Sequence, residues 1–600
     1  MQTPLHPFTK RVSTTCKKEK CLEFIERRTY RKDIDGIRAI AVLAVIIFHF
    51  GHLPGGYLGV DIFFVISGYL ITGIIYRQVA ENQFSIKNFY LRRIKRIIPL
   101  VLFICLITLM LGIVLMLPND LKSLAQEIIA TNFFSNNILQ ILTAKNYWHV
   151  ANEYKPLIHT WSLGIEEQYY ILYPFIFLFF VQPSTNKKRT LLLILSSLTL
   201  ISIGLLFYPF PDIHKFYLLP FRFFELSCGG IVAIMLNGKT IKHPFSIVFI
   251  LALLLIVGFG SNFLSHNILL LLIALITCGI LMTANEKSNL SRLILENKAV
   301  VFLGKISFSM YMWHQVLLAF GRYAFFEQIS VEGYVLMLAL TIVLSVFTYY
   351  IIEQPFRHKI ETRTVMAILV SAFFIITGAS IFIYLKAGVI RNIPELEISK
   401  HHTSKDIHAK YSDRIYTFDN DFKSSNKIKI LTIGNSFARD WANVLLESKF
   451  SENIEISHVG AFARSYLPDR AKEADYIFVT GKEKENVVES GIDMSKVWRV
   501  GTKNFGYSMG IFYNYDGDDY CQQRTHVKTA ILQKNNKLKN EWGDRYIDLT
   551  DLIIDQQKTV PVFTPNCEFI SHDCHHFSKA GAKYFASLLE NQLDFIFNEN

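Results

Sequence analysis

A serine in the polar C-terminal part of the chain stands where it could act as a nucleophile. Residues 429–440 form a short apolar run, then Gly434 and Asn435, then a helix-like run, which predicts a strand, a tight turn and a helix. Glycine permits such a turn because it adopts backbone conformations closed to other residues. Ser436 would then lie at the N-terminus of the helix, where backbone N–H groups favour a developing oxyanion. An ordinary helix-capping serine fits the same pattern.

A second polar run supplies the two other groups that a serine nucleophile needs. Asp573 precedes His576 by three residues, a spacing at which a carboxylate can orient an imidazole, which can then take a proton from a serine. His575 competes with His576 for this role, and clustered histidines also fit a metal site or a solvated loop. Taken with Ser436, the run predicts a triad that transfers or hydrolyses acyl groups.

The first part of the chain places charged residues in or beside apolar runs. Arg38 and His49 lie near one face of the first run, and a charge in a bilayer costs at least about 2.5 kcal/mol, which makes it a candidate for function. Arg38 could instead snorkel to the interface. Arg93 and Arg96 share a helix face and suit a phosphate group, although they also fit a positive cluster that fixes membrane orientation. Glu167, at the head of a later run, is a candidate acidic partner.

Apolar segments of membrane-spanning length position these residues. Of the 600 residues, 51% are hydrophobic, and long apolar runs alternate with short polar loops. The predicted spans are 37–53, 57–76, 98–117, 163–181, 190–208, 219–236, 244–260, 266–284, 302–321, 333–352 and 365–385. Lys and Arg gather in alternate loops, so we expect a cytoplasmic N-terminus and, after an odd number of crossings, a C-terminal part outside the cytoplasm. The net charge of +12 has the same origin and does not require nucleic acid.

The C-terminal part has a different pattern, in which short β-rich runs alternate with helix-like stretches. This alternation predicts a soluble α/β domain. The whole chain is then a cytoplasmic segment, a transmembrane domain, one further transmembrane helix, a linker and an α/β domain. The predicted boundaries are 1–32, 33–360, 361–388, 389–428 and 429–600.

Five motifs, in this order, resemble those of the bacterial acyltransferase-3 membrane family. They are Arg38-(ten residues)-His49, Phe63-Phe-Val-Ile-Ser-Gly-Tyr-Leu-Ile-Thr72, Arg93-x-x-Arg96, Trp161-Ser-Leu-Gly-Ile-Glu-Glu-Gln168 and Ser307-Phe-Ser-Met-Tyr-Met-Trp-His314. The resemblance implies about ten core helices, acetyl-CoA as the cytoplasmic acyl donor and an extracytoplasmic glycan as the acceptor. It also implies that Arg93 and Arg96 hold the phosphates of CoA and that His49, matched with Arg38, acts as a general base or proton relay. Asp61 is expected to line the same polar region or to cap a helix at the interface.

The C-terminal part resembles the SGNH hydrolase and transferase family, which has an α/β/α fold. The resemblance lies in the Gly-Asn-Ser turn that ends at Ser436 and in the later Asp-x-x-His run. It implies that Ser436 is the nucleophile, His576 the base and Asp573 the orienting acid. Asn435 departs from the family pattern, in which Asp follows the glycine, but the change is conservative in shape.

The same resemblance implies an oxyanion hole. The backbone N–H of Gly460 and the side chain of Asn504 are the candidate donors.

The two resemblances together predict an inner-membrane O-acetyltransferase with a periplasmic α/β domain. We expect it to move acetyl from acetyl-CoA to a hydroxyl group of a lipid-linked surface glycan, with lipopolysaccharide O-antigen as the first choice and peptidoglycan as the second. Membrane lipids are the other expected partners, and neither a metal nor nucleic acid is expected. A polysaccharide transporter is an alternative, but the helix breaks and internal repeats that would support it are not evident. An esterase with the same triad is the third possibility.

Three cysteines lie in the part predicted to be outside the cytoplasm, where disulfides form. Cys521–Cys567 is the preferred pair. Cys567–Cys574 is the alternative, and it would staple the loop that carries Asp573 and His576.

Overall fold

The computed structural model describes most of the chain. It covers residues 30–143, 152–180, 187–237, 245–283, 289–324, 329–401, 407–423, 426–481, 484–506 and 509–598. Nearly all of the predicted cytoplasmic segment 1–32 lies outside the described residues, as do Lys239 and Lys242 between two of the predicted spans. The chain divides into two compact units, which are described separately: Met1–Leu91 with Ile165–Tyr311, and Arg92–Gly164 with Met312–Asn600.

Helices occur at all eleven predicted spans. Within the described ranges, seven are long and apolar enough to cross a membrane: Gly56–Ala80, Ile86–Leu115, Lys188–Phe207, Asp212–Leu236, His266–Thr283, Val331–Lys359 and Thr362–Leu385. The helices at the other four predicted spans are α2 (Lys32–His49), α7 (Thr160–Phe180), α11 (Ser246–Phe259) and α15 (Ser307–Ala324). These four are shorter or less apolar. The prediction of a multi-pass helical membrane protein is therefore confirmed.

Two helices begin earlier than predicted. α2 begins at Lys32 rather than at residue 37 and ends at His49, because Asp33 and Asp35 are buried at 1% and 7% exposure instead of facing water. The Nε atom of Arg31 donates to Asp33 at 3.2 Å, and Tyr30 donates to Asp35. α4 (Ile86–Leu115) begins well before residue 98, so Arg93 and Arg96, which precede the predicted span, lie within the same helix as that span.

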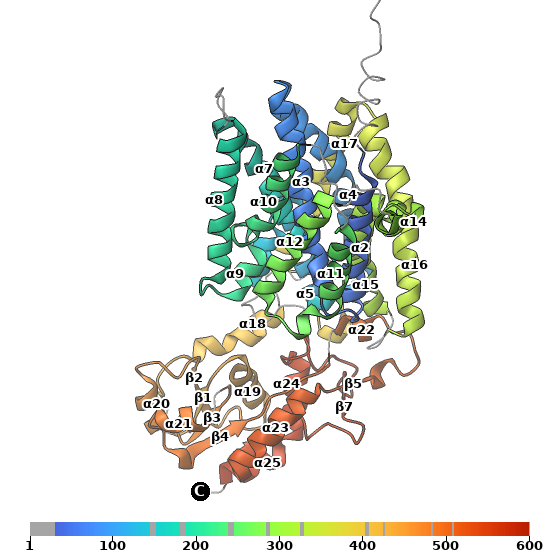
Figure 1. Cartoon of the computed structure of the whole chain (residues 1–600). Coiled ribbons are helices and arrows are strands. Elements are labelled where there is room, and N and C mark those ends of the chain that lie inside the picture. The colour runs from blue at the N-terminus through green and yellow to red at the C-terminus, as the bar shows by residue number, and fades with distance from the viewer. Residues whose placement is uncertain are drawn as a thin grey trace, which may run out of the picture. The chain divides into compact units, whose positions relative to one another are not determined.

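The first unit is a helical bundle in which α3 (Gly59–Ala80) packs closely on α10 (Leu219–Leu236) (Figure 1). Small residues allow this approach. A Cβ atom on Gly68 would lie 1.7 Å from the carbonyl oxygen of Leu226, and one on Gly229 would lie 2.0 Å from that of Val65. The remaining helices of the unit include α8 (Lys187–Phe207), α9 (Asp212–Tyr217), α12 (His266–Thr283), α13 (Asn289–Leu295) and α14 (Lys298–Lys305).

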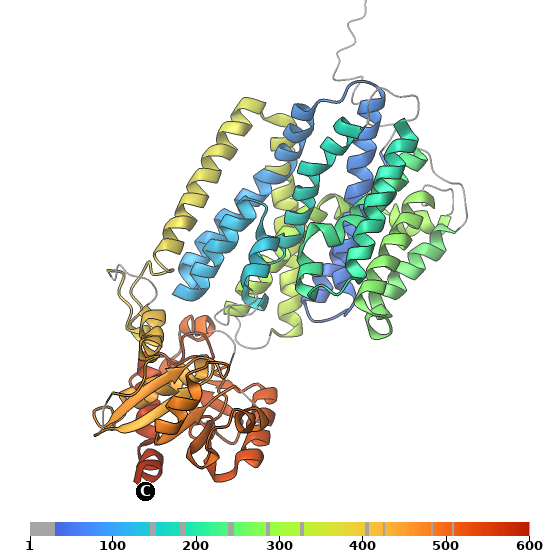
Figure 2. The same ribbon diagram turned by 90° about the vertical axis from the view of Figure 1, so that its left-hand side faces the viewer.

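The second unit combines long helices with the C-terminal α/β part. Its helices before residue 390 include most of α4, α5 (Pro118–Asn132), α6 (Asn136–Thr143), α16 (Val331–Thr348) and α17 (Thr362–Leu385), the last of which is a single long helix in Figure 2. α17 packs on α5, where Asn132 donates to the Thr377 hydroxyl at 2.9 Å.

A five-stranded parallel sheet forms the centre of the C-terminal part. Its strands, in spatial order, are β2 (Ile454–Val459), β1 (Ile428–Ile433), β3 (Tyr476–Val479), β4 (Val497–Val500) and β6 (Tyr546–Ile547). The chain reverses its direction of winding at β1, since β2 lies on one side of this strand and β3 on the other. Ligands of open α/β sheets bind at the carboxyl ends of the strands at such a reversal.

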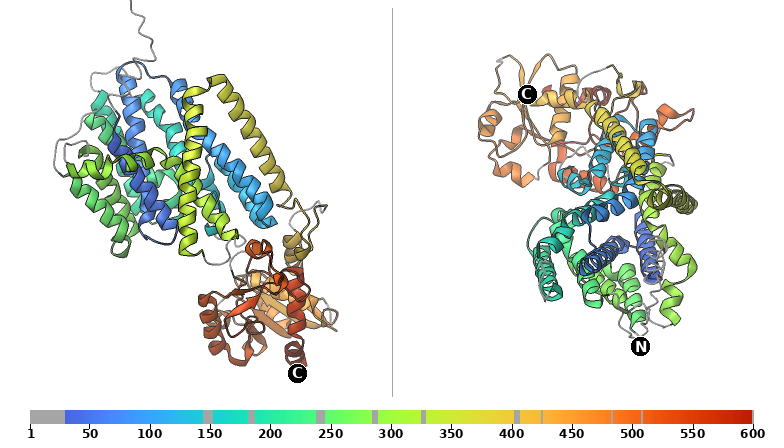
Figure 3. Two further views of the ribbon diagram at one scale, coloured as in Figure 1. Left: turned by 90° about the vertical axis from the view of Figure 1, so that its right-hand side faces the viewer. Right: turned by 90° about the horizontal axis from the view of Figure 1, so that it is seen from above.

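Helices cover both faces of the sheet, because alternate strand residues point into separate cores. Ile430 belongs to the core with α19 (Ser436–Glu447), α24 (Lys579–Leu588) and α25 (Glu590–Asn598). The last two helices are the red ones beside the orange strands in Figure 3. Leu431 and Ile433 belong to the core with α20 (Leu467–Glu473), α21 (Lys484–Glu489) and α23 (Thr529–Trp542). The prediction of an α/β domain is therefore confirmed, whereas its predicted boundaries stay a prediction.

A disulfide closes the loop region beside a second, two-stranded sheet. Cys521 and Cys567 are bonded, with their Cα atoms 5.0 Å apart. They flank β5 (Arg524–His526) and β7 (Thr559–Pro561), which pair antiparallel. Cys574 is buried and takes no part in a disulfide. The preferred pairing is thus confirmed, and the alternative Cys567–Cys574 is wrong.

A candidate serine acyl-transfer site

The proposed nucleophile lies at the start of a helix that follows the central strand. Ser436 is the first residue of α19, directly after the turn that leaves β1. Asn435 caps this helix, because its Oδ1 atom accepts from the backbone N–H of Phe437 at 3.1 Å. The side chain that departs from the SGNH pattern therefore holds the turn that presents Ser436.

Gly434 brings this turn against the end of β3. Its φ of +134° lies outside the range that other residues adopt readily, and a Cβ atom there would stand 2.4 Å from Thr480 Oγ1 and 2.6 Å from the Thr480 carbonyl oxygen. The Thr480 hydroxyl also donates to Asn435 Oδ1 at 3.2 Å. The strand–turn–helix predicted from the sequence is thus fixed from a neighbouring strand.

We expect Gly434→Ala to destabilise the α/β part and to slow acylation of Ser436. The strained backbone alone costs about 1–3 kcal/mol, and the contact with Thr480 adds to it. Gly491→Ala is the matched control, because Gly491 also has a positive φ of +74° but has open space around its Cβ position. Thermal unfolding of the full chain in detergent compares the two variants. Equal shifts would contradict the steric part of this prediction.

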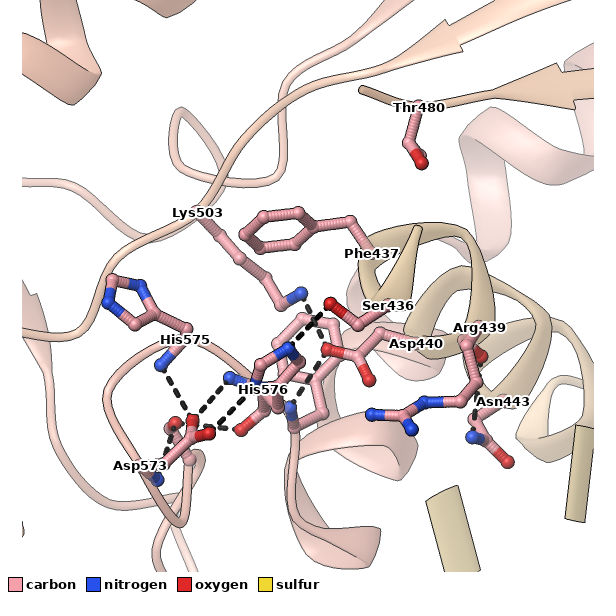
Figure 4. A network of polar contacts seen from close by, with 12 residues as sticks. Ser436, Phe437, Arg439, Asp440, Asn443, Thr480, Lys503, Asp573, His575 and His576 are labelled. Carbon is pink, nitrogen blue, oxygen red and sulfur yellow. Dashed lines mark hydrogen bonds and ion pairs between the residues drawn. The ribbon is translucent and has the colours of Figure 1, made fainter. Parts of the chain in front are cut away.

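The structure joins the three predicted triad residues in one chain of hydrogen bonds (Figure 4). The Nε2 atom of His576 lies 2.8 Å from Ser436 Oγ, and its Nδ1 atom lies 2.6 Å from Asp573 Oδ2. His576 is fully buried. The imidazole therefore touches the nucleophile on one side and a carboxylate on the other, which is the arrangement that general-base activation requires.

Asp573 is held as a carboxylate. Its other oxygen, Oδ1, accepts from the backbone N–H groups of His575 and His576 at 2.9 and 2.8 Å. Burial alone would raise the pKa of Asp573, but positive charge on His572 and His576, together with the hydrogen bonds from His576, holds this pKa well below its usual range. The residue can therefore stabilise a protonated His576 without taking its proton.

His575 does not take the place of the base. Figure 4 shows its imidazole pointing away from Ser436, while its backbone N–H bonds to Asp573. Burial lowers the pKa of His575. No group of three or more His, Cys, Asp or Glu side chains that could hold a metal ion occurs among the residues that the structure describes.

The two candidate oxyanion donors have different surroundings. Gly460 follows β2, is exposed, and has no neighbouring atom within 4 Å of its Cβ position. Asn504 is buried, and its amide nitrogen donates to the Gly506 carbonyl at 3.2 Å while its oxygen accepts from the backbone N–H groups of Gly506 and Lys528. These bonds tie Asn504 to its own loop, and the oxyanion role of both residues stays a prediction.

A buried ion pair beside the triad did not emerge from the sequence. Lys503 Nζ lies 2.7 Å from Asp440 Oδ2, and both side chains are almost fully buried. Burial lowers the pKa of Lys503, and the Asp440 carboxylate opposes this effect. Asp440 follows Ser436 by four residues on α19, a spacing that places both on one helix face and was the available signal.

Arg38 and His49 both belong to α2 in the first unit. Their separation of eleven residues puts them near one face, about 16 Å apart along the axis. Arg38 Nη1 lies 3.5 Å from Asp35 Oδ1, and its side chain is 15% exposed. His49 is the last residue of the helix and is half-buried. Arg38 therefore lies in the N-terminal half of the helix and His49 at its C-terminal end, and their predicted roles stay predictions.

Arg93 and Arg96 lie on α4 in the second unit, three residues apart and both half-buried. Their predicted role in holding phosphate stays a prediction.

The two adjacent glutamates of α7 both lie among polar or buried groups. Glu166 accepts hydrogen bonds from the hydroxyls of Ser67 and Tyr170. Glu167 is buried at 8% exposure. Ser67 belongs to the Phe-Phe-Val-Ile-Ser-Gly motif and Glu166 to the Trp161–Gln168 motif, so the first unit joins two motifs that lie about a hundred residues apart.

Asp61, predicted as polar lining or a cap, is instead part of a buried cluster of charges. Arg222 Nη1 lies 2.8 Å from Asp61 Oδ1 and 3.0 Å from Glu225 Oε1, and none of the three side chains is more than 2% exposed. Two charges in the predicted span 219–236 were the signal that could have identified this cluster.

The last residue of the Ser307–His314 motif lies beside another histidine in the second unit. His159 lies just before α7 and His314 lies on α15; their ring centroids are 5.2 Å apart, and both residues are buried. The side chain of the next residue, Gln315, donates to the Lys155 carbonyl at 3.1 Å. The fold thus concentrates buried polar groups at the positions of the sequence motifs.

The region that holds these motifs matches a known protein family. The model of a family described as an acyltransferase domain matches residues 31–352, which is more than half of the chain. O-acetyltransferase OatA of Staphylococcus aureus strain NCTC 8325 / PS 47 is 31% identical over 364 residues, or 57% of this chain and 59% of that protein. A protein of strain MSSA476 whose name includes the term O-acetyltransferase is 31% identical over 357 residues, or 56% of this chain and 58% of that protein.

The chain therefore matches less than two thirds of the length of these relatives. The region matched by the family ends before the α/β part begins. No solved structure matches the chain.

Proposed function

Because the chain belongs to the acyltransferase family whose model matches residues 31–352, we propose that it is a membrane O-acetyltransferase that esterifies an extracytoplasmic glycan. The donor is acetyl-CoA, used from the cytoplasm by the helical part. The acceptor is a hydroxyl group of a surface glycan, with lipopolysaccharide O-antigen as the first choice and peptidoglycan as the alternative. The names of the relatives, which include O-acetyltransferase, support the reaction class.

The observation that carries the proposal is the Ser436–His576–Asp573 hydrogen-bond chain, with distances of 2.8 and 2.6 Å. Ser436 lies just after the carboxyl end of β1, and open α/β sheets bind their ligands at such strand ends. This constellation is why we assign the α/β part to the SGNH type and give Ser436 the role of acyl carrier.

In the first half of the proposed reaction, Ser436 becomes acetylated. His576 Nε2 takes the Ser436 proton while Oγ attacks the carbonyl carbon of the acetyl donor, and the carbonyl electron pair moves to its oxygen. The intermediate collapses when the bond from carbon to the leaving atom breaks. The proton on His576 passes to that leaving atom, so the enzyme holds an acetyl ester and His576 is neutral again.

In the second half, the glycan takes the acetyl group. A glycan hydroxyl attacks the acetyl carbon, and its proton moves to His576. The Ser436–acetyl bond breaks, and His576 returns the proton to Ser436 Oγ. Backbone N–H groups at the start of α19, with Gly460 and Asn504 as further candidates, would stabilise the oxyanion in both halves.

The helical part would deliver the acetyl group. We assign the phosphates of CoA to Arg93 and Arg96, the role of general base or proton relay to His49, and supporting charge to Arg38 and Glu167. These roles follow from the resemblance and from the presence of ionisable groups in apolar helices.

The proposed topology places the N-terminus in the cytoplasm of a bacterial inner-membrane protein and the α/β part outside it. The Cys521–Cys567 disulfide supports this side, because disulfides persist in oxidising compartments. The proposed domains keep the boundaries 33–360, 361–388, 389–428 and 429–600.

The test measures O-acetyl groups on separately purified lipopolysaccharide and peptidoglycan from cells that lack the gene and carry one variant each. His49→Ala and Ser436→Ala should both lose acetylation of the same glycan, whereas His52→Ala, an exposed neighbour, should keep it. Loss with His49→Ala alone would remove Ser436 from the reaction. Unchanged acetylation in the deleted strain would overturn the proposal, and a gain of acetyl groups there would favour an esterase.

A further inference from the structure

Asp440 connects the nucleophile helix to the backbone beside the base. It lies four residues after Ser436 on α19 and is 1% exposed. Its Oδ2 atom accepts from the backbone N–H of Phe577 at 3.1 Å and from Lys503 Nζ at 2.7 Å. Since Phe577 directly follows His576, this carboxylate oxygen fixes the loop that carries the base relative to the helix that carries Ser436 (Figure 4).

Lys503 reaches the same place from a third segment, the loop after β4. Its Nζ atom lies 4.2 Å from the ring centroid of Phe437 and 4.5 Å from that of Phe577. The Phe437 ring in turn stacks on the His576 imidazole, with centroids 5.9 Å apart and planes at 25°. The ammonium group therefore contacts the residues that directly follow Ser436 and His576 in the sequence.

The pair is buried, and this distinguishes it from the ion pairs on the surface. Lys449 and Asp594 form a pair of similar length, 2.6 Å, but their side chains are 45% and 38% exposed, against 2% and 1% for Lys503 and Asp440. Removing one partner of a buried pair leaves an uncompensated charge, whereas an exposed pair contributes little.

We propose that Asp440 and Lys503 are a positioning pair, in which Asp440 holds His576 at hydrogen-bond distance from Ser436 and Lys503 keeps Asp440 in place. Neither residue touches the reacting atoms in this role. The inference rests on the proposed function of Ser436 as an acyl carrier. It adds that the distance between Ser436 and His576 depends on the hydrogen bond from Phe577 to Asp440. Phe577 directly follows His576, and Asp440 lies one helical turn after Ser436.

The test follows covalent labelling of Ser436 by a fluorophosphonate in the full-length protein in detergent. In this reaction Oγ bonds to phosphorus, fluoride leaves, and His576 takes the serine proton. The rate constant reports the activation of Ser436, whereas the labelled fraction reports how much protein is folded. Lys503→Met should slow labelling by about tenfold to a hundredfold, because a displaced base is costly.

Two double variants separate positioning from charge compensation. Asp440→Asn with Lys503→Met removes both charges but keeps an acceptor for the Phe577 N–H, so labelling should return to near the wild-type rate. Asp440→Leu with Lys503→Met also removes the acceptor, so labelling should stay slow. Lys449→Met with Asp594→Asn is the surface control and should label like the wild type.

Each outcome is decisive. If both double variants label at the same rate, or if Lys503→Met labels like the wild type, the positioning role is wrong. If Lys503→Met does not fold, the two double variants still decide, because neither leaves a buried charge unpaired. If wild type and Ser436→Ala label equally, the proposed function itself fails, and this result is distinct from a failure of the positioning pair alone.

Discussion

Replacing Asp573 by asparagine is expected to slow acyl transfer at Ser436 by about 10³–10⁴-fold. The carboxylate now accepts from Nδ1 of His576 at 2.6 Å, which leaves Nε2 without a proton and able to take the one on Ser436. The amide of asparagine can donate to Nδ1 instead. The imidazole then carries its proton on Nε2, where it faces Ser436 Oγ and cannot accept.

The rate of acetyl release from a small activated ester measures this effect in purified full-length protein. Asp518→Asn serves as the control, because Asp518 is exposed and outside the site. A variant at Asp573 that keeps a tenth or more of the wild-type rate would contradict the assigned role.

The same substitution should also show a pH-dependent cost in stability. The pKa of Asp573 is lower in the folded protein than in the unfolded chain, so its charge stabilises the fold above about pH 4, the unfolded value. Wild type should exceed the asparagine variant in stability by a constant amount from about pH 7 to pH 5, and the difference should shrink as the pH falls below about 4. A difference that grows on acidification has the wrong sign.

The second large effect concerns the buried charges of the first unit. Arg222→Met should lower the free energy of unfolding by about 3–5 kcal/mol. The guanidinium group contacts both Asp61 and Glu225, at 2.8 and 3.0 Å. Its removal leaves two buried carboxylates without a counter-charge, and their mutual repulsion adds to the cost of burial.

Thermal unfolding in detergent, followed by the fraction that stays monodisperse, measures this loss. Arg292→Met is the matched control, since Arg292 pairs with Glu296 at 3.5 Å but is 57% exposed. The combined change of Asp61→Asn, Arg222→Met and Glu225→Gln should recover much of the stability, because no unpaired charge remains. An equally unstable combined variant would assign the loss to packing rather than to charge.

The sequence predicted the part of the site that has local signals. A few consecutive residues are enough to recognise the turn before Ser436. The same holds for the short spacing from Asp573 to His576. The strand–turn–helix and the choice of His576 over His575 both agree with the geometry. The Cys521–Cys567 bond was the preferred of the two pairings considered for the three cysteines in this part of the chain.

Other features depend on tertiary contacts that no local pattern encodes. The bond from Asp440 to Phe577 joins residues 137 positions apart, and the one from Arg222 to Asp61 joins residues 161 apart. Single members such as Asp61 carried a signal, but their partners could not be identified from the sequence. The start of α2 was misplaced for a related reason: the fold supplies partners for Asp33 and Asp35, which let these carboxylates be buried within the helix.

The distance in sequence between nucleophile and base has a consequence for how the protein is made. Ser436 and His576 are separated by 140 residues, which a ribosome takes roughly 7–28 s to translate at about 5–20 residues per second. During that interval the α19 helix and its serine exist without the imidazole that activates them. In the proposed reaction, Ser436 therefore gains its base only after the loop bearing His576 has been synthesised and has folded back onto the sheet.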